Sequence, residues 1–130
     1  MNAIGYNRSM IICDIDDTLL RNGTQPIKKT IDYVNSLNTR VVIVTGRERS
    51  QRTETVKALK DAGVKYSSLL MNPYSYKLSN KWKAEVAEKL KEATLAIDDN
   101  AGARSAYSKA GIKAIHPDDV PDMEKFWTLN

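Results

Sequence analysis

Acidic residues follow directly on two apolar runs of the chain. The first run, residues 11–13, leads into the segment Asp14–Thr18, which contains three aspartates. The second run, residues 94–97, ends in the pair Asp98 and Asp99. Carboxylates that lie close together repel one another unless a cation compensates for their charge. If the two runs are neighbouring strands, folding brings these acids around one point, and we expect a cation there.

The ligands available on this chain indicate which cation that is. Carboxylate oxygens are preferred by hard ions such as Mg²⁺, whereas zinc sites are built from thiolates and imidazoles. The sequence holds a single cysteine, Cys13, and a single histidine, His116. Cys13 also lies in an apolar run and is expected to be a small buried side chain. The acid cluster therefore predicts a magnesium site.

A third apolar run is followed by groups that suit phosphate. Residues 41–44 lead into Thr45, Gly46 and Arg47. They offer a hydroxyl, a backbone that can approach closely, and a guanidinium that donates to two phosphate oxygens at once. An ion pair with Glu48 or another acid is the alternative for Arg47. We favour the phosphate contact.

These runs have to be strands of one sheet for their ends to meet. Apolar runs alternate with segments of helical periodicity, which is typical of a parallel sheet covered by helices on both faces. The expected strands are residues 10–15, 40–45, 64–70, 94–97 and 112–115. Four helices are expected. The first follows Pro26, the second carries Val56 and Leu59 and ends at Gly63, the third begins near Asn80, and the fourth spans residues 101–110 before Gly111. In such folds, ligands bind beyond the carboxyl ends of the strands.

Composition bounds the protein class. The 130 residues are 42% hydrophobic and 28% charged, which is typical of one globular domain over residues 1–130. The formal charge of +4 favours anionic substrates and polyanions, although many basic domains bind no nucleic acid. The first eight residues lack the apolar run of a signal peptide, and no apolar stretch is long enough to span a membrane. We expect a cytoplasmic protein with no membrane contact.

Three of these motifs, in this order, resemble the haloacid dehalogenase superfamily of phosphohydrolases. The segment Asp14–Thr18 matches its first motif, Asp-x-Asp-x-Thr, while Thr45 matches the second and Asp98–Asp99 the fourth. The resemblance spans residues 9–116. It implies an α/β fold, a Rossmann-like three-layer sandwich around a five-stranded parallel sheet of order 3-2-1-4-5, with the site at strands one and four.

The resemblance also implies a role for each site residue. Asp14 attacks phosphorus and forms an aspartyl-phosphate, while Asp16 protonates the leaving oxygen and then activates the water. Thr45 hydrogen-bonds the transferring group. The implied ligands of Mg²⁺ are Asp14, the backbone carbonyl of Asp16, Asp98 and, directly or through water, Asp99. The presence of Asp16 favours phosphate-ester hydrolysis or phosphotransfer over attack on carbon–halogen bonds.

The third motif of the superfamily is a lysine near the start of the helix before strand four, where it offsets repulsion between phosphate and nucleophile. Lys77, Lys81 and Lys83 all lie in this window. Residues 83–86, Lys-Ala-Glu-Val, resemble the start of that helix. Lys83 is therefore our choice for catalysis and substrate binding, with Lys81 as the fallback, and a solvated surface lysine is the alternative reading for each.

The chain leaves no room for a cap domain, because residues 19–39 and 48–82 hold little beyond the expected elements. Caps close over small substrates, whereas an open site suits phosphate on a polymer or a protein surface. Among capless members, residues 41–48 and 95–99 resemble the phosphatase domain of polynucleotide kinase-phosphatases, which removes 3′-phosphate from nucleic acid ends. The phosphate-binding loop of a kinase is absent from the sequence.

Two positions depart from that domain. Ser79 stands where it has an acid before its lysine, and Gln25 stands where it has an arginine, for which Arg21 is the nearest substitute. Tyr74, Tyr76 and Trp82 precede the favoured lysine and offer aromatic faces on which bases stack. Trp82 shares helical spacing with Val86 and Leu90, which favours a place in the core, whereas for the two tyrosines a structural role and a stacking role are equally favoured.

The favoured function is therefore Mg²⁺-dependent removal of 3′-phosphate from nucleic acid ends. One alternative is a phosphatase of mononucleotides or other small phosphate esters, and phosphopeptides also fit an open site. A further alternative is a non-catalytic accessory protein that binds phosphate or nucleic acid. The intact pair of Asp14 and Asp16 argues against this last reading.

Overall fold

The computed structural model describes residues 9–127. Five parallel strands form one sheet in the order β5-β4-β1-β6-β7. They are β1 (Met10–Cys13), β4 (Arg40–Glu48), β5 (Ser68–Asn72), β6 (Leu95–Ile97) and β7 (Ala114–Ile115). Two short strands, β2 (Leu20–Arg21) and β3 (Gln25–Pro26), pair with each other in a separate hairpin. The five-stranded sheet has the predicted order 3-2-1-4-5, so the predicted Rossmann-like α/β fold is confirmed.

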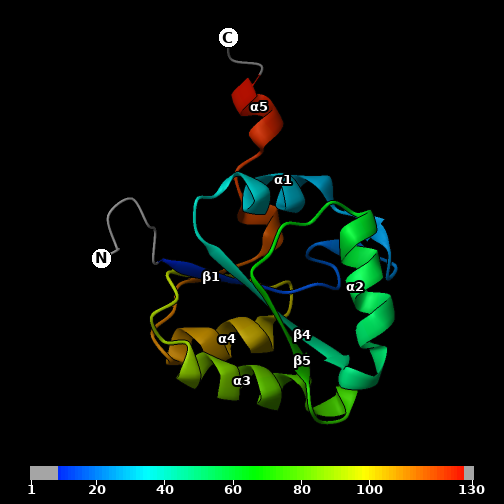
Figure 1. The fold of residues 1–130 in the computed structure, drawn as a ribbon. Helices are drawn as coiled ribbons and strands as arrows, with labels where there is room; N and C mark the ends of the chain where they lie inside the picture. The colour runs from blue at the N-terminus through cyan, green and yellow to red at the C-terminus, as the bar shows by residue number, and fades with distance from the viewer. Residues whose placement is uncertain (1–8, 128–130) are drawn as a thin grey trace, which may run out of the picture.

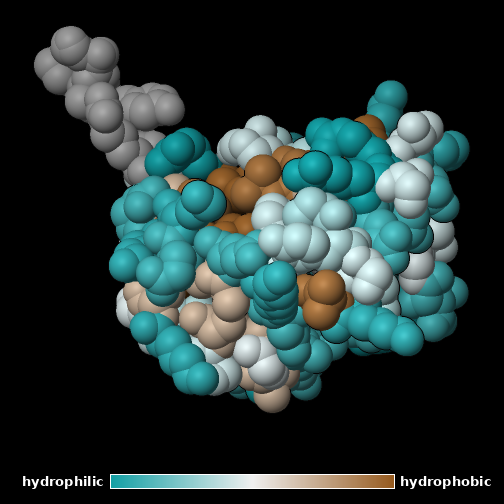
Figure 2. All heavy atoms as spheres, turned by 90° about the horizontal axis from the view of Figure 1, so that it is seen from below, coloured by the Kyte–Doolittle hydropathy of each residue, from teal (hydrophilic) through white to brown (hydrophobic). Residues whose placement is uncertain are grey.

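Helices cover both faces of this sheet (Figure 1). They are α1 (Lys28–Ser36) and α2 (Arg52–Asp61) on one face, and α3 (Ser79–Lys89) and α4 (Ala101–Lys109) on the other. The short helix α5 (Met123–Trp127) contacts α1. Three 3₁₀ turns complete the elements: η1 (Arg49–Gln51), η2 (Tyr76–Leu78) and η3 (Pro117–Asp119). Seen from below Figure 1, the surface is mainly hydrophilic and apolar side chains gather in small areas (Figure 2).

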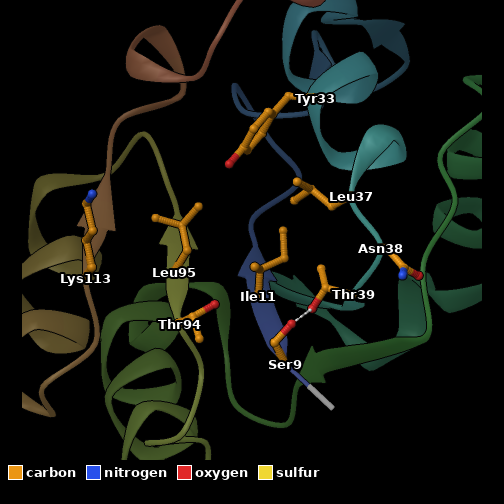
Figure 3. Close-up of a pocket in the computed structure, with 9 residues that line it drawn as sticks. All are labelled: Ser9, Ile11, Tyr33, Leu37, Asn38, Thr39, Thr94, Leu95 and Lys113. Atoms are coloured by element: carbon orange, nitrogen blue, oxygen red, sulfur yellow. Dashed lines mark hydrogen bonds between the residues drawn. The ribbon is translucent and has the colours of Figure 1, made fainter. Parts of the chain in front are cut away.

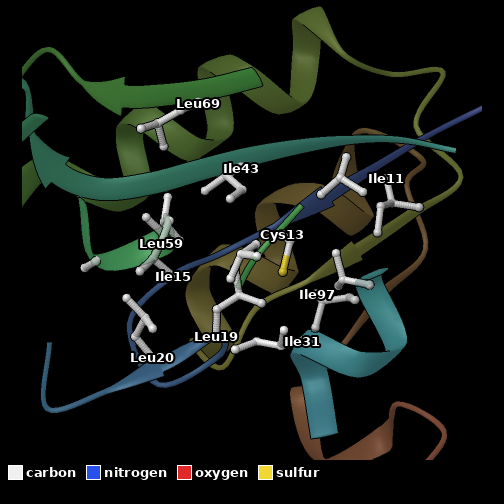
Figure 4. Packing of buried hydrophobic residues seen from close by; sticks show 14 of the residues in the cluster. Ile11, Cys13, Ile15, Leu19, Leu20, Ile31, Ile43, Leu59, Leu69 and Ile97 are labelled. Carbon is white, nitrogen blue, oxygen red and sulfur yellow. The ribbon is translucent and has the colours of Figure 1, made fainter. Parts of the chain in front are cut away.

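The central strand β1 supplies both halves of the core. Ile11 and Cys13 pack in the cluster that includes Leu59 of α2 (Figure 4). Met10 and Ile12 belong to the cluster on the side of α3 and α4. A strand buried on both faces is a continuous apolar run, because successive side chains point to opposite faces. Cys13 is fully buried, as predicted, and burial raises the pKa of its thiol well above the usual value.

Of the two apolar residues that marked helix α2 in the sequence, Val56 and Leu59, only Leu59 lies in the core. Leu59 is buried with Thr55 and Ala58, whereas Val56 is 37% exposed. Thr55 lies three and four positions before Ala58 and Leu59 and shares their face, whereas Val56 is three positions from Leu59 but only two from Ala58 and lies at the edge of that face. An apolar residue at the edge of the stripe is therefore left at the surface.

Two strands have boundaries that differ from the prediction. β4 continues past Thr45 to Glu48, because it pairs with β5 across a bulge. β5 begins only at Ser68, since Gly63 has a positive φ of 75° and the N–H of Val64 still donates to the carbonyl of Leu59, so that these residues belong to the end of α2.

In the described part of the chain, no helix is long and apolar enough to cross a membrane. The first eight residues, for which the sequence indicates no signal peptide, lie outside the described range.

Candidate active site

The carboxyl ends of β1 and β6 bring the two acidic segments together. The strands pair in parallel with Cys13 opposite Ile97, and the N–H of Asp14 donates to the carbonyl of Ile97 at 3.0 Å. Asp14 and Asp98 therefore leave the sheet at the same edge, and only 5% and 1% of their surfaces are exposed. One carboxylate oxygen of Asp99 lies within 4.8 Å of oxygens of both. The predicted acid cluster is thus assembled.

Lys83 places its ammonium between the two buried acids. Its Nζ donates to Asp14 Oδ1 at 2.8 Å and to Asp98 Oδ2 at 2.7 Å. The residue is 5% exposed, because it lies on the buried side of α3 together with Val86 and Ala87. Burial on its own lowers the pKa of Lys83, but the two carboxylates outweigh it and raise the pKa above its usual value. The side chain is therefore a permanent cation.

The other two lysines of the predicted window lie elsewhere. Lys77 and Lys81 are exposed. The Nζ of Lys81 lies 4.7 Å from the ring centre of Tyr74, in a cation–π contact. Of the three candidate lysines, Lys83 is the one that reaches the acids.

The charges of this cluster do not balance. Oxygens of three carboxylates, those of Asp14, Asp98 and Asp99, lie within 4.8 Å of one another, and the single ammonium of Lys83 pairs with two of them. Burial raises the pKa of Asp14 well above its usual value, Lys83 opposes the rise, and Asp98 adds to it. An all-oxygen donor set with excess negative charge is what a hard divalent cation requires. The three carboxylates therefore fit a divalent metal, whose charge would favour the ionised form of Asp14.

Thr18 fixes the other oxygen of the buried aspartate. Its hydroxyl donates to Asp14 Oδ2 at 3.0 Å and accepts from the N–H of Asp99 at 3.2 Å. The Thr18 hydroxyl thereby joins the segment after β1 to the segment after β6. Both oxygens of Asp14 are thus oriented.

Asp16 is held by Arg47 and lies outside the buried cluster. Arg47 donates from Nε to Asp16 Oδ2 at 3.0 Å and from Nη2 to Asp16 Oδ1 at 2.8 Å. The same guanidinium donates to Thr55 Oγ1 and to the carbonyl of Gly23. The side chain of Asp16 is 49% exposed, whereas that of Arg47 is 12% exposed. The alternative considered for Arg47 was an ion pair with an acid, and in this structure Arg47 forms one with Asp16.

Thr45 and Gly46 lie in β4 at the start of the bulge that separates Thr45 from Glu48. Thr45 is fully buried, and its hydroxyl accepts from the N–H of Arg47 at 3.0 Å. Its carbonyl accepts from Trp82 Nε1 at 3.1 Å, so the aromatic residue of α3 packs against the site rather than serving as an open platform. The buried side-chain amide of Asn72, the last residue of β5, donates to the carbonyl of Gly46 at 3.1 Å and stabilises this bulge.

A side chain at position 46 is expected to displace α3. A Cβ on Gly46 would lie 2.7 Å from the Cβ of Ser79, the first residue of the helix that carries Lys83. We predict that Gly46→Ala lowers the free energy of unfolding by about 1–3 kcal/mol, the usual cost of overpacking, and lowers activity. Urea unfolding and phosphate release measure the two effects. Ser79→Gly added to Gly46→Ala restores both if the clash is the cause, whereas an unrestored double variant contradicts this reading.

A cavity of about 240 Å³ lies at the carboxyl ends of the strands, and its charged lining residues are Asp14, Asp16, Asp17, Lys83 and Asp99. Its lining also includes Gly46, Tyr76, Ser79, Asn80 and Asn100. Sequence reasoning gave no role to Asn80 and Asn100. The one available signal was the position of Asn100 directly after Asp99 and before a helix, since its side chain caps α4 by accepting from the N–H of Ala103 at 2.9 Å.

Another cavity, of about 390 Å³, lies at the amino ends of the strands (Figure 3). Ser9, Thr39 and Thr94 line it just before β1, β4 and β6 begin, and Tyr33 and Lys113 lie at its edge. Its lining holds no carboxylate. This cavity is therefore separate from the acid cluster, at the opposite end of the sheet.

Comparison with solved structures supports the fold. A chain in the structure of the Pnkp1/Rnl/Hen1 RNA repair complex superimposes with a TM-score of 0.69 at 21% sequence identity. The match covers 85% of this chain and 42% of that chain, so the protein spans less than half of its neighbour. At this identity the likeness shows the fold alone.

Comparison of the sequence with family models identifies the family of the chain. No match was found among curated proteins. A family model described as HAD superfamily, subfamily IIIB (Acid phosphatase), matches residues 22–106, which is more than half of the chain and includes Thr45, Lys83 and Asp98. The chain belongs to this family and is a phosphatase of the HAD superfamily.

Proposed function

We propose that this phosphatase is a Mg²⁺-dependent phosphomonoester hydrolase that works through an aspartyl-phosphate on Asp14, and that its substrates are 3′-phosphate ends of nucleic acids. The observation that carries the proposal is the buried centre in which Lys83 bonds both Asp14 and Asp98 beside an open cavity. A carboxylate nucleophile, a fixed cation and a metal-binding set of oxygens are the groups that phosphoryl transfer requires.

In the first half of the reaction, a carboxylate oxygen of Asp14 attacks phosphorus and the bond from phosphorus to the leaving oxygen breaks. Asp16, in its protonated form, gives its proton to that leaving oxygen. Lys83 offsets the negative charge that gathers between the phosphate and Asp14. The hydroxyl of Thr45 accepts from Arg47, which leaves its own hydrogen to bond a phosphoryl oxygen.

The second half of the reaction frees the enzyme. Asp16, now ionised, takes a proton from water, and the resulting hydroxide attacks the phosphorus of the aspartyl-phosphate. The bond between phosphorus and the Asp14 oxygen breaks, which restores the carboxylate and releases inorganic phosphate. The proton balance closes, because Asp16 ends with the proton it began with.

Bound Mg²⁺ supplies positive charge that stabilises the phosphoryl oxygens in both steps. The residues that would hold it are Asp14, Asp98, Asp99 and, through its backbone carbonyl, Asp16. Lys83 bonds one oxygen of Asp14 and one of Asp98, while the other oxygens accept from the Thr18 hydroxyl and from the N–H of Asn100. A metal would therefore use a further lone pair of these carboxylates.

At least one of the two hydrogen bonds from Arg47 to Asp16 has to break during this cycle. Both oxygens of Asp16 accept from the guanidinium, so neither can carry and deliver a proton to substrate until one of these hydrogen bonds breaks. A phosphate oxygen is a competing acceptor for the same donors. Arg47 would thus bind substrate as proposed while freeing an Asp16 oxygen.

Nucleic acid ends are favoured as substrates for three reasons. Between β1 and β4 the chain forms only the hairpin β2–β3 and helix α1, which leaves the site open to a polymer. The formal charge of +4 attracts polyanions. The structural neighbour is part of an RNA repair complex, and its chain shares this fold.

A substrate panel tests this function. We would measure kcat/KM for an RNA oligonucleotide with a 3′-phosphate, the same oligonucleotide with a 5′-phosphate, a 3′-mononucleotide and a phosphopeptide, each with Mg²⁺ and with EDTA. We expect the 3′-phosphorylated oligonucleotide to be preferred by about tenfold or more and EDTA to abolish turnover. Preference for the mononucleotide or the phosphopeptide would contradict the nucleic acid assignment, and unchanged turnover in EDTA would contradict the metal.

A further inference from the structure

A second cavity, of about 380 Å³, borders the candidate active site on the side of Asp16. Asp16 and Tyr76 line both this cavity and the one that contains Asp14, so the two are neighbours. The other walls of the second cavity include Thr24 of the β2–β3 turn, and Gln51 and Glu54 of η1 and α2. None of these three residues takes part in the proposed chemical steps.

The cationic side chain that lines this cavity, Arg47, has most of its N–H donors already occupied. Four of the five N–H donors of Arg47 are already bonded, two to Asp16, one to Thr55 and one to the carbonyl of Gly23. Glu54 lies close enough to act electrostatically on Arg47 and adds negative charge to the wall. A second phosphate is therefore disfavoured here, and a neutral polar group is favoured.

The walls are held in place by one carboxylate. Glu48 Oε2 accepts from the N–H of Tyr76 at 2.9 Å, and the Glu48 side chain also accepts from the N–H of Gln51. In turn, Gln51 Oε1 accepts a hydrogen bond from the N–H of Glu48 at 3.2 Å. The turns η1 and η2 are therefore tied to the same residue at the end of β4, which positions the backbones of Gln51 and Tyr76 at this cavity.

The reaction geometry dictates what enters this cavity. In an in-line displacement the leaving oxygen lies on the far side of phosphorus from Asp14, and it has to reach Asp16 to be protonated. Asp16 is the shared wall, so the group attached to the leaving oxygen extends over it, away from Asp14. The cavity volume is that of a small organic ligand. Tyr76 lines both cavities and is 69% exposed, so its side chain is accessible to a bound group.

We propose that the second cavity binds the nucleoside that carries the scissile phosphate, with Tyr76 stacking on its base and Thr24, Gln51 and Glu54 facing its sugar and base edges. This inference rests on the proposed function and deepens it. The same nucleoside chemistry is offered by a strand end and by a 3′-mononucleotide, and stacking on an aromatic ring tolerates any base.

The test removes the ring and the base separately. Substrates are an RNA oligonucleotide 3′-phosphate, the same oligonucleotide ending in an abasic ribose 3′-phosphate, a 3′-mononucleotide, and acetyl phosphate, whose leaving group is too small to fill the cavity. The enzymes are the wild type, Tyr76→Ala, Tyr76→Phe and, as a matched control, Leu78→Ala. Leu78 is also exposed and lies in the same turn η2, but it does not line the cavity.

We expect Tyr76→Ala to raise KM about tenfold for the oligonucleotide and the mononucleotide that have a terminal base. KM for the abasic oligonucleotide and for acetyl phosphate should stay within about twofold, and Tyr76→Phe and Leu78→Ala should match the wild type, since stacking needs only the ring. An effect on the mononucleotide but not on the oligonucleotide would show that a strand end is seated elsewhere and would overturn the proposal for strand ends.

Two kinds of failure are distinguishable. If the wild type removes 3′-phosphate from the oligonucleotide but Tyr76→Ala is equal to it, or is impaired equally on base-containing and abasic ends, the nucleoside cavity is wrong and the proposed function stands. If the wild type hydrolyses acetyl phosphate but none of the nucleotide substrates, the nucleic acid function falls and this inference falls with it.

Discussion

Replacing Asp14 with asparagine is expected to lower phosphate release by about 10⁴-fold or more, the scale of loss when the nucleophile of a catalytic unit is removed. The amide has nearly the same shape but lacks the negative charge and the nucleophilic oxygen. Steady-state kinetics on the preferred substrate measures the loss. Mass spectrometry of acid-quenched samples provides a second readout, because the wild type should carry one phosphoryl group on the peptide that contains Asp14 and the variant should not.

Asp17→Asn is the matched control for this change. Asp17 is exposed and has a positive φ of 59°, a conformation that asparagine tolerates. We expect its activity to stay within about tenfold of the wild type, because Asp17 takes no chemical step in the mechanism. Turnover by Asp14→Asn above about a tenth of the wild-type rate, or a phosphoryl group found on another residue, would exclude Asp14 as the nucleophile.

Replacing Lys83 with methionine is expected to lower the free energy of unfolding by about 3–5 kcal/mol in the absence of metal, the usual cost of removing one partner from a buried ionic group. The ammonium bonds Asp14 and Asp98 at 2.8 and 2.7 Å, and the variant leaves these two buried carboxylates facing each other. Urea unfolding in EDTA measures the loss. Lys81→Met is the control, since Lys81 is exposed and such changes usually alter stability by about 0.5 kcal/mol or less.

The same variant reports on the metal site without any activity measurement. If Asp14, Asp98 and Asp99 bind a divalent cation, Mg²⁺ should recover part of the stability lost in Lys83→Met, because the ion replaces the missing positive charge. The deficit should also shrink as the pH falls, since protonation of either Asp14 or Asp98 removes the repulsion. A loss of less than about 1 kcal/mol in EDTA would show that the ammonium does not hold the two acids together.

Features that depend on strand order were predictable from the sequence. Asp14 and Asp98 each follow an apolar run, and adjacent parallel strands end at one edge of a sheet, so their meeting follows from local patterns. Lys83 could be ranked above its neighbours because of the resemblance of its segment to a known motif. Its burial follows from the same helical face that contains Val86 and Ala87.

Features that depend on side-chain reach across the fold were not predictable. Arg47 was expected to meet phosphate, yet its partner Asp16 lies 31 positions away, and no local pattern indicates which acid a long guanidinium will reach. The hairpin β2–β3 was missed because two-residue strands leave too short a pattern. Glu48 also accepts from the backbone N–H of Tyr76, 28 positions away, and the sequence carries no signal for this contact. Its bond to the N–H of Gln51 belongs to a capping box, which is a local pattern.

The central position of β1 has a consequence for how the protein is made. β1 precedes both of its partner strands in the sequence: it pairs with β4 on one side and with β6 on the other, and β6 ends at Ile97. A growing chain that has not yet reached β6 therefore holds Asp14 beside an open strand edge, which invites wrong pairing. A chain that ends before β6 also lacks Asp98, so we expect such a fragment to be inactive as a phosphatase and sensitive to proteases.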